Sequence, residues 1–262
     1  MHPETSGKAR HRHRPRPCLV HLPWIRRAGP AGPVDARSGR FGHRAGGVGK
    51  TTLIKLLTGM YKPTDGTIRI DGTPLTEMDP AEWALRSAGA FQDFVKFQTL
   101  TRHTVGMGDL ERLDDRSAVQ TAVERAHATS VIDQLDEGLD TQLGKMFAGT
   151  DLSHGQWQKL AVARGMMRST PLLLVLDEPT AALDPQAEHD LFEDYAAGSA
   201  RAKRAAGAIT VLVSHRFSTV RMADLVFVLE DGTITEHGTH GELTAKDGTY
   251  AGIYRMQAAA YR

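Results

Sequence analysis

Unbroken runs of apolar residues, rather than alternating patterns, mark the second half of the chain. Residues 172–176 (LLLVL) and 208–213 (AITVLV) are the clearest of these runs, and residues 225–229 form a third. Runs of this length are typical of strands buried on both faces, as in a parallel sheet covered by helices. The third run turns at Asp231-Gly232 into the alternating segment TITEHG, which indicates a hairpin. We therefore expect an α/β fold.

Helical periodicity separates these strands. The segment that begins at Lys50 has an apolar face at i, i+3 and i+4 spacing, ended by Gly59. Further helices are expected over residues 114–136, after an N-cap at Ser153, over 186–195, and as a pair at the C-terminus. Residues 66–72 and 88–91 predict two short strands, the first in an antiparallel layer beside the main sheet, and residues 143–149 a loop.

Composition limits the class of protein. Hydrophobic residues make up 40% of the 262 and charged residues 24%, as in ordinary soluble domains. The apolar runs fall far short of the ~20 residues that a membrane-spanning helix needs, and no signal peptide is visible. The single cysteine, Cys18, excludes an internal disulfide and fits a reducing compartment.

The first part of the chain differs from the rest. Residues 1–44 hold ten Lys or Arg, two acids and six of the twelve prolines, and they show neither helical nor strand periodicity. We therefore divide the chain into an irregular head, residues 1–45, and a folded body, residues 46–262. Two hypotheses stay open for the head: a disordered basic tail attracted to nucleic acid or anionic lipid, or a stretch translated out of frame.

The body begins with a glycine-rich loop that precedes the first helix. Residues 46–52 read GGVGKTT, most of the phosphate-binding pattern G-x-x-x-x-G-K-[ST], although Arg44 stands where that pattern has its first glycine. Such a loop wraps phosphate oxygens with backbone N–H groups, its lysine reaches the β- and γ-phosphates, and the following hydroxyl takes Mg²⁺. The nucleotide-binding candidates are Gly46, Gly47, Val48, Gly49, Lys50, Thr51 and Thr52.

Polar residues follow several predicted strands directly. Asp177 and Glu178 come after the run at 172–176, Gln92 follows residues 88–91, and His215 lies just beyond residues 208–213. The carboxyl ends of parallel strands meet at one sheet edge, where open α/β sheets bind ligands. A buried carboxylate requires a partner or a metal, so two adjacent acids at this edge favour a functional site.

The order of six motifs along the chain resembles that of the ATP-binding cassette of ABC transporters, over about residues 45–256. They are the loop at 46–52, Gln92, LSHGQ at 152–156, LLLVLDE at 172–178, AALD at 181–184 and His215. The resemblance implies a P-loop NTPase, RecA-like core sheet with an antiparallel β layer and an inserted helical subdomain, about residues 93–168. The ending, VLEDGTITEHGTHGEL, looks most like exporter-type cassettes.

The resemblance also assigns roles. ATP and Mg²⁺ are the implied cofactors, with Thr51, Gln92 and Asp177 around the metal. Glu178 would be the general base, and Lys50 and His215 would hold the phosphates. Two cassettes close head to tail in this family, so the partner's ATP would meet a second set of residues: Ser153, Gly155, Gln156 and Asp184. A transmembrane domain would bind residues 92–109 and keep the chain at the cytoplasmic face of the membrane, and no nucleic acid is expected.

The chain departs from the family pattern at three points: Arg44, His154 in place of a signature glycine, and no convincing strand or adenine-stacking aromatic before the loop, Trp24 being the nearest candidate. Two alternatives to an export ATPase therefore remain. One is a truncated cassette that binds nucleotide poorly or not at all. The other is a non-transport ABC ATPase that acts on nucleic acid, which only the basic head favours.

Overall fold

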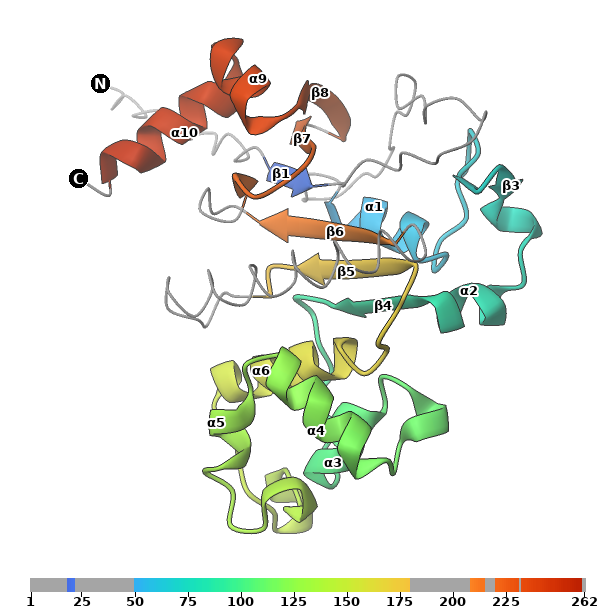
Figure 1. Ribbon diagram of the computed structural model, residues 1–262, viewed down its shortest axis with the longest axis vertical. Coiled ribbons are helices and arrows are strands. Elements are labelled where there is room, and N and C mark those ends of the chain that lie inside the picture. Colours follow the sequence, from blue (N-terminus) through green and yellow to red (C-terminus); the bar gives the residue numbers. More distant parts are fainter. Residues whose placement is uncertain (1–17, 22–49, 180–207, 215–219, 231, 261–262) are drawn as a thin grey trace, which may run out of the picture.

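A computed structural model of the chain describes residues 18–21, 50–179, 208–214, 220–230 and 232–260. Its centre is a six-stranded sheet in the order β4-β5-β6-β1-β7-β8 (Figure 1). The strands are β1 (Cys18–His21), β4 (Ser87–Ala90), β5 (Leu173–Asp177), β6 (Ile209–Ser214), β7 (Val226–Glu230) and β8 (Thr233–Gly238). Strands β4, β5 and β6 are parallel, which confirms the expected parallel arrangement of the apolar runs.

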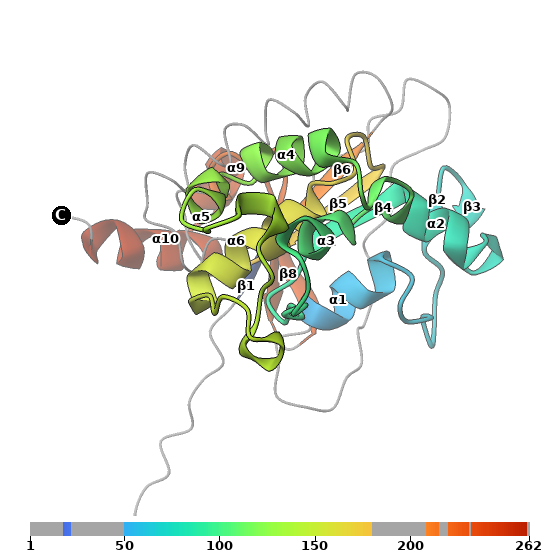
Figure 2. The ribbon, with the colours of Figure 1, turned by 90° about the horizontal axis from the view of Figure 1, so that it is seen from below.

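Strand β5 is buried on both faces. Leu173 and Val175 point to the face that packs against Leu53 and Ile54 of helix α1 (Lys50–Leu57). Leu174 and Leu176 point to the opposite face, which packs against the helices between β4 and β5. Side chains alternate between the faces of a strand, so a strand buried on both faces needs an unbroken apolar run. Figure 2 views the molecule from below, with α1 on one side of the strands.

Strand β1 differs from the expectation for the head. The sequence predicted no strand before residue 46, yet Cys18–His21 lies between β6 and β7 and pairs antiparallel with both. A four-residue run between prolines is too short to show a periodic pattern. Its extended conformation is stabilised by backbone hydrogen bonds to two neighbouring strands, which no local pattern reveals.

Trp83 links helix α1 to the helix that precedes strand β4. Helix α2 (Pro80–Arg86) begins at Asp79, whose side chain accepts a hydrogen bond from the Ala81 N–H, and it buries Trp83. The indole N–H of Trp83 donates to the carbonyl of Leu57, 3.1 Å away, at the last residue of α1. The expected strand within residues 66–72 is present as β2 (Arg69–Ile70), which pairs with β3 (Thr73–Pro74) in a separate two-stranded antiparallel sheet.

Four helices gather beyond β4, on the side of the sheet away from the C-terminal helices (Figure 1). They are α3 (Thr101–Gly106), α4 (Arg116–Arg125), α5 (Thr129–Ile132) and α6 (His154–Gly165). The single helix expected over 114–136 is therefore two, because the chain breaks at His127, whose φ of +50° is left-handed. The loop expected over 143–149 contains one 3-10 turn, Lys145–Phe147.

The C-terminal helix pair is confirmed as α9 (His240–Ala245) and α10 (Thr249–Ala260). A capping box between Thr239 and Glu242 begins α9, and Leu243 and Tyr250 pack on one face of β7. Among the helices in the described ranges, none has the length and apolar character needed to cross a lipid bilayer. The helix expected over 186–195 lies outside the described residues.

Candidate functional site

The two acids at the end of β5 lie at the carboxyl edge of the parallel strands, as predicted. Asp177 is the last residue of β5 and is 7% exposed, and it pairs in register with Val213 of β6. Glu178 follows directly, outside the strand. The apolar run before them fixes their position, because a buried strand can release polar side chains only where it leaves the core.

Lys50 and Glu178 form an ion pair across this edge. The ammonium Nζ of Lys50 lies 3.0 Å from Oε1 of Glu178, with the two side chains 25% and 14% exposed. Lys50 is the first residue of α1, and 128 positions separate the two residues in the sequence. The fold therefore brings together the lysine of the glycine-rich loop and the acid proposed as general base.

Burial controls the protonation of Asp177. Desolvation raises the pKa of its carboxyl group to about 6, and the negative charges of Glu178 and Asp93 add to this effect. The positive charge of Lys50 acts in the opposite direction but does not compensate. A cation placed beside Asp177 would lower this raised pKa, since a nearby positive charge favours the ionised form of a carboxyl group.

Glu178 has a left-handed backbone conformation, and hydrogen bonds hold its backbone on both sides. Its φ is +47°, a region that non-glycine residues seldom occupy. Its N–H donates to the carbonyl of Val213 at 3.0 Å, and its own carbonyl accepts from Nε2 of Gln158 at 3.0 Å. Strain of this kind persists where the surrounding structure fixes it, and it clusters at functional sites.

The segment LSHGQ begins helix α6, as the N-cap at Ser153 predicted. The Ser153 hydroxyl accepts from the Gln156 N–H, and the Gln156 side chain accepts from the Ser153 N–H, which together make a capping box. The amide of Gln156 also donates to Oε1 of Gln134. Ser153 and His154 are exposed, so this helix end faces solvent, although the capping box already uses the N–H groups of Ser153 and Gln156.

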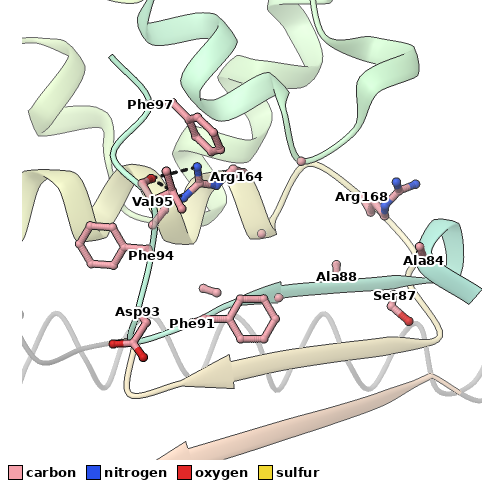
Figure 3. A pocket seen from close by; sticks show the side chains of 15 residues that line it. Ala84, Ser87, Ala88, Phe91, Asp93, Phe94, Val95, Phe97, Arg164 and Arg168 are labelled. Atoms are coloured by element: carbon pink, nitrogen blue, oxygen red, sulfur yellow. Dashed lines mark hydrogen bonds between the residues drawn. The ribbon is translucent and has the colours of Figure 1, made fainter. Parts of the chain in front are cut away.

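The segment that follows Gln92 packs against α6. The rings of Phe94 and His154 lie 5.3 Å apart, and the Arg164 guanidinium donates to the carbonyl of Val95 (Figure 3). Burial lowers the pKa of Arg164, whose guanidinium also lies 4.8 Å from the centroid of the Phe97 ring. A cavity of about 340 Å³ opens here between β4, this segment and α6.

The structure places some predicted site residues and not others. Lys50, Asp177 and Glu178 lie together. Thr51 is exposed in the first turn of α1, and Gln92 is exposed two residues after the end of β4. Oxygen donors of these kinds (a hydroxyl, an amide and a carboxylate) are those that Mg²⁺ prefers when it binds beside nucleotide phosphates. The following predicted residues lie outside the described ranges: Gly46, Gly47, Val48, Gly49, Asp184 and His215.

Sequence reasoning missed Gln158. The signal was available, because Gln158 lies on the face of α6 that carries Trp157, Leu160 and Ala161, where an amide is unusual. It also missed Asp93, whose charge acts on Asp177. Asp93 directly follows Gln92, but nothing in the local pattern separates it from an ordinary loop residue.

Known proteins with similar sequences identify the family of the chain. A family profile described as "ABC transporter" matches residues 44–181, just over half of the chain. Curated relatives include the "ATP-dependent lipid A-core flippase" of Alcanivorax borkumensis, 37% identical over 236 residues, which covers 87% of this chain and 39% of the relative. The "ABC multidrug transporter atrC" of Emericella nidulans is 37% identical over 239 residues, covering 88% of this chain and 17% of that protein.

A solved structure of an ABC exporter is also similar to this chain. The "Structure of a bacterial Atm1-family ABC exporter with ATP bound" matches with a TM-score of 0.71 and 27% identity, over 95% of this chain and 44% of that one. The chain thus spans less than half the length of these relatives.

Proposed function

The chain belongs to the ABC transporter family, and we propose that it binds and hydrolyses ATP to power export across a membrane. The observation that carries the proposal is the cluster at the carboxyl edge of the sheet, where Lys50 meets Glu178 and the buried Asp177 lies beside them. A lysine that begins a helix and two acids at the end of a strand are the parts that phosphoryl transfer to water requires.

ATP binding exchanges the partner of Lys50. The β- and γ-phosphates carry more charge than one carboxylate, so the ammonium moves from Glu178 to the phosphates. Glu178 can then accept a proton from the attacking water, as a general base. Mg²⁺ bound with the nucleotide would neutralise charge on the phosphate oxygens, and Thr51, Gln92 and Asp177 would hold it. His215 would orient the γ-phosphate.

A second cassette completes the proposed site. The N-terminus of α6 is exposed and offers backbone N–H groups and the Ser153 hydroxyl to an anion. In a head-to-tail dimer, Ser153, Gly155 and Gln156 would bind the γ-phosphate of the partner's ATP, and Asp184 would connect the two sites. Dimerisation is supported by the exporter character of the relatives.

The membrane partner is proposed to bind at the cavity between β4 and α6. The segment at residues 92–109 borders this cavity and presents Val95, 61% exposed, at its surface. A transmembrane domain there would hold the chain at the cytoplasmic face of the membrane. Gln92 begins this segment, so movement of the segment would shift Gln92 at the nucleotide site.

The first experiment measures the melting temperature of the purified chain with Mg-ATP and with Mg²⁺ alone. A ligand that binds the native state must raise it, by mass action. We expect a rise of several degrees that the Lys50→Ala variant loses, followed by release of inorganic phosphate. No rise in the wild-type chain would refute the proposal and support an impaired cassette.

Two further measurements address the remaining alternatives. Binding to DNA or RNA that weakens steeply with salt would favour a nucleic-acid ATPase instead. Sequencing the DNA upstream of codon 50 in all three frames decides the origin of residues 1–45. A frame that encodes a strand and a first loop glycine joined to Gly46 would make those residues an artefact.

A further inference from the structure

We propose that Gln158 is a positioning residue for Glu178: from helix α6 of the same protomer, it holds the general base in its left-handed conformation. The inference rests on the proposed function, because it concerns the residue that activates water there. Gln158 touches neither nucleotide nor water in this scheme. It acts through the backbone of Glu178.

The contact is direct and buried. Nε2 of Gln158 donates to the Glu178 carbonyl oxygen at 3.0 Å, and Gln158 is 6% exposed. Its other amide atom, Oε1, is buried and accepts no hydrogen bond from any residue that the structure describes. Burying an amide with one atom unsatisfied costs free energy that an apolar side chain would avoid. The bond to Glu178 is what this position gains in return.

The conformation of Glu178 explains the need for that bond. A glutamate at φ +47° is strained, and in an unrestrained chain it would relax to negative φ. The N–H of Glu178 is anchored to Val213 at 3.0 Å, at the end of the β5–β6 ladder. Only the carbonyl side then needs a second anchor, and Gln158 supplies it from α6. Two anchors on either side of the residue fix where the carboxylate points.

This arrangement couples the helical group to the acid. Gln158 lies in α6, two residues after Gln156 and five residues after the N-cap Ser153, which is about 1.4 turns, so a shift of α6 moves the anchor of Glu178. Helix α6 of each protomer would thus position the general base of that protomer through Gln158, while its N-terminus would serve the partner's ATP. One helix would act on two different nucleotides.

The test replaces Gln158 by Met, which matches its length and lacks the donor. We expect kcat for ATP hydrolysis to fall at least tenfold while KM for ATP stays within twofold, because the phosphate-binding groups are unchanged. A second readout does not depend on hydrolysis: amide hydrogen exchange of the peptide that spans residues 173–179, in the nucleotide-free chain. We expect exchange at Glu178 to be at least tenfold faster in the variant.

Gln120→Met is the matched control. Gln120 also donates from its amide, to Glu124 on the exposed side of α4, and should change neither readout. Wild-type kcat and unchanged exchange in Gln158→Met would overturn the inference, as would equal losses of ATP binding and kcat. If the wild-type chain releases no phosphate, the proposed function fails, and the exchange experiment still decides whether Gln158 holds Glu178.

Discussion

Lys50 and Glu178 satisfy each other's charge at 3.0 Å, although the proposed reaction requires them to act on different atoms. The lysine must face the phosphates, and the glutamate must face a water. Their ion pair therefore defines a resting state that nucleotide has to break. Because both side chains are largely buried, the pair is screened less by solvent than a surface salt bridge.

Replacement of Glu178 by Gln should separate ATP binding from hydrolysis. The amide keeps the size of the side chain but releases Lys50 and cannot accept a proton from water. We expect ATP affinity, measured with a fluorescent nucleotide, to rise a few fold and phosphate release to fall at least a hundredfold. Glu111→Gln, on an exposed 3-10 turn, is the control. Unchanged ATP affinity in Glu178→Gln would show that the ion pair does not compete with nucleotide.

Binding of Mg²⁺ should depend on pH through Asp177. Because its pKa is about 6, the carboxyl group of Asp177 is protonated in most molecules below that pH, whereas Mg²⁺ binds the anion. We expect the apparent affinity for Mg²⁺ in the presence of ATP to rise as the pH increases from about 5 to 7. Titration of Mg²⁺ by calorimetry at several pH values checks this. A flat profile would contradict the assigned role.

The same group should affect stability with the opposite sign. Between the ordinary Asp pKa of 3.8 and about 6, folded Asp177 binds a proton more tightly than the unfolded chain does. The free energy of unfolding should therefore fall as pH rises through this window, by up to ~3 kcal/mol at about 1.4 kcal/mol per pKa unit. Asp177→Asn should remove that dependence and be the more stable protein at pH 7, as urea denaturation would reveal.

His154 should limit activity as it stands. Its ring lies beside Phe94 at the exposed start of α6, where the resemblance expects glycine and close contact with the partner's phosphate. We expect His154→Gly to raise ATP hydrolysis a few fold at high protein concentration, where dimers form, with a melting temperature a few degrees lower because glycine weakens helices. Phe94→Leu, which removes the ring contact but leaves the imidazole, separates loss of that contact from opening of the helix end. Equal gains in both variants would contradict the steric explanation.

Gly165 should be required for the contact between α6 and the sheet. A Cβ at this position would lie 2.7 Å from the carbonyl oxygen of Gly89 in β4, a backbone atom that cannot move aside alone. We expect Gly165→Ala to lower the free energy of unfolding by ~1–3 kcal/mol. Gly252→Ala in α10 meets no atom within 4 Å and should instead raise it by up to ~1 kcal/mol. A neutral Gly165→Ala would show that the two elements can separate without cost.

Sequence patterns predicted the parts of the fold that rest on local chemistry. The buried strand before Asp177 and the N-cap at Ser153 follow from rules that act within a few residues, and both are confirmed. The hairpin of β7 and β8 and the C-terminal helix pair are confirmed for the same reason.

What escaped prediction depends on distant partners. The bond from Gln158 to Glu178 joins residues 20 positions apart, and the ion pair of Lys50 joins residues 128 apart. The left-handed break at His127 splits a segment whose apolar spacing reads as continuous helix. A pattern can mark such residues as unusual, but only the folded chain shows what they contact.

Strand β1 gives the head of the chain a mechanical meaning. In the strand order, Cys18–His21 is the only described segment between the parallel strands and the β7–β8 hairpin, so the backbone hydrogen bonds joining the two halves all pass through it. Four residues of the head, which shows no periodic pattern, thus join the two parts of the sheet. If they were lost, the molecule would be expected to open in two cooperative units rather than one, with the hairpin and its helices exchanging their amide hydrogens first.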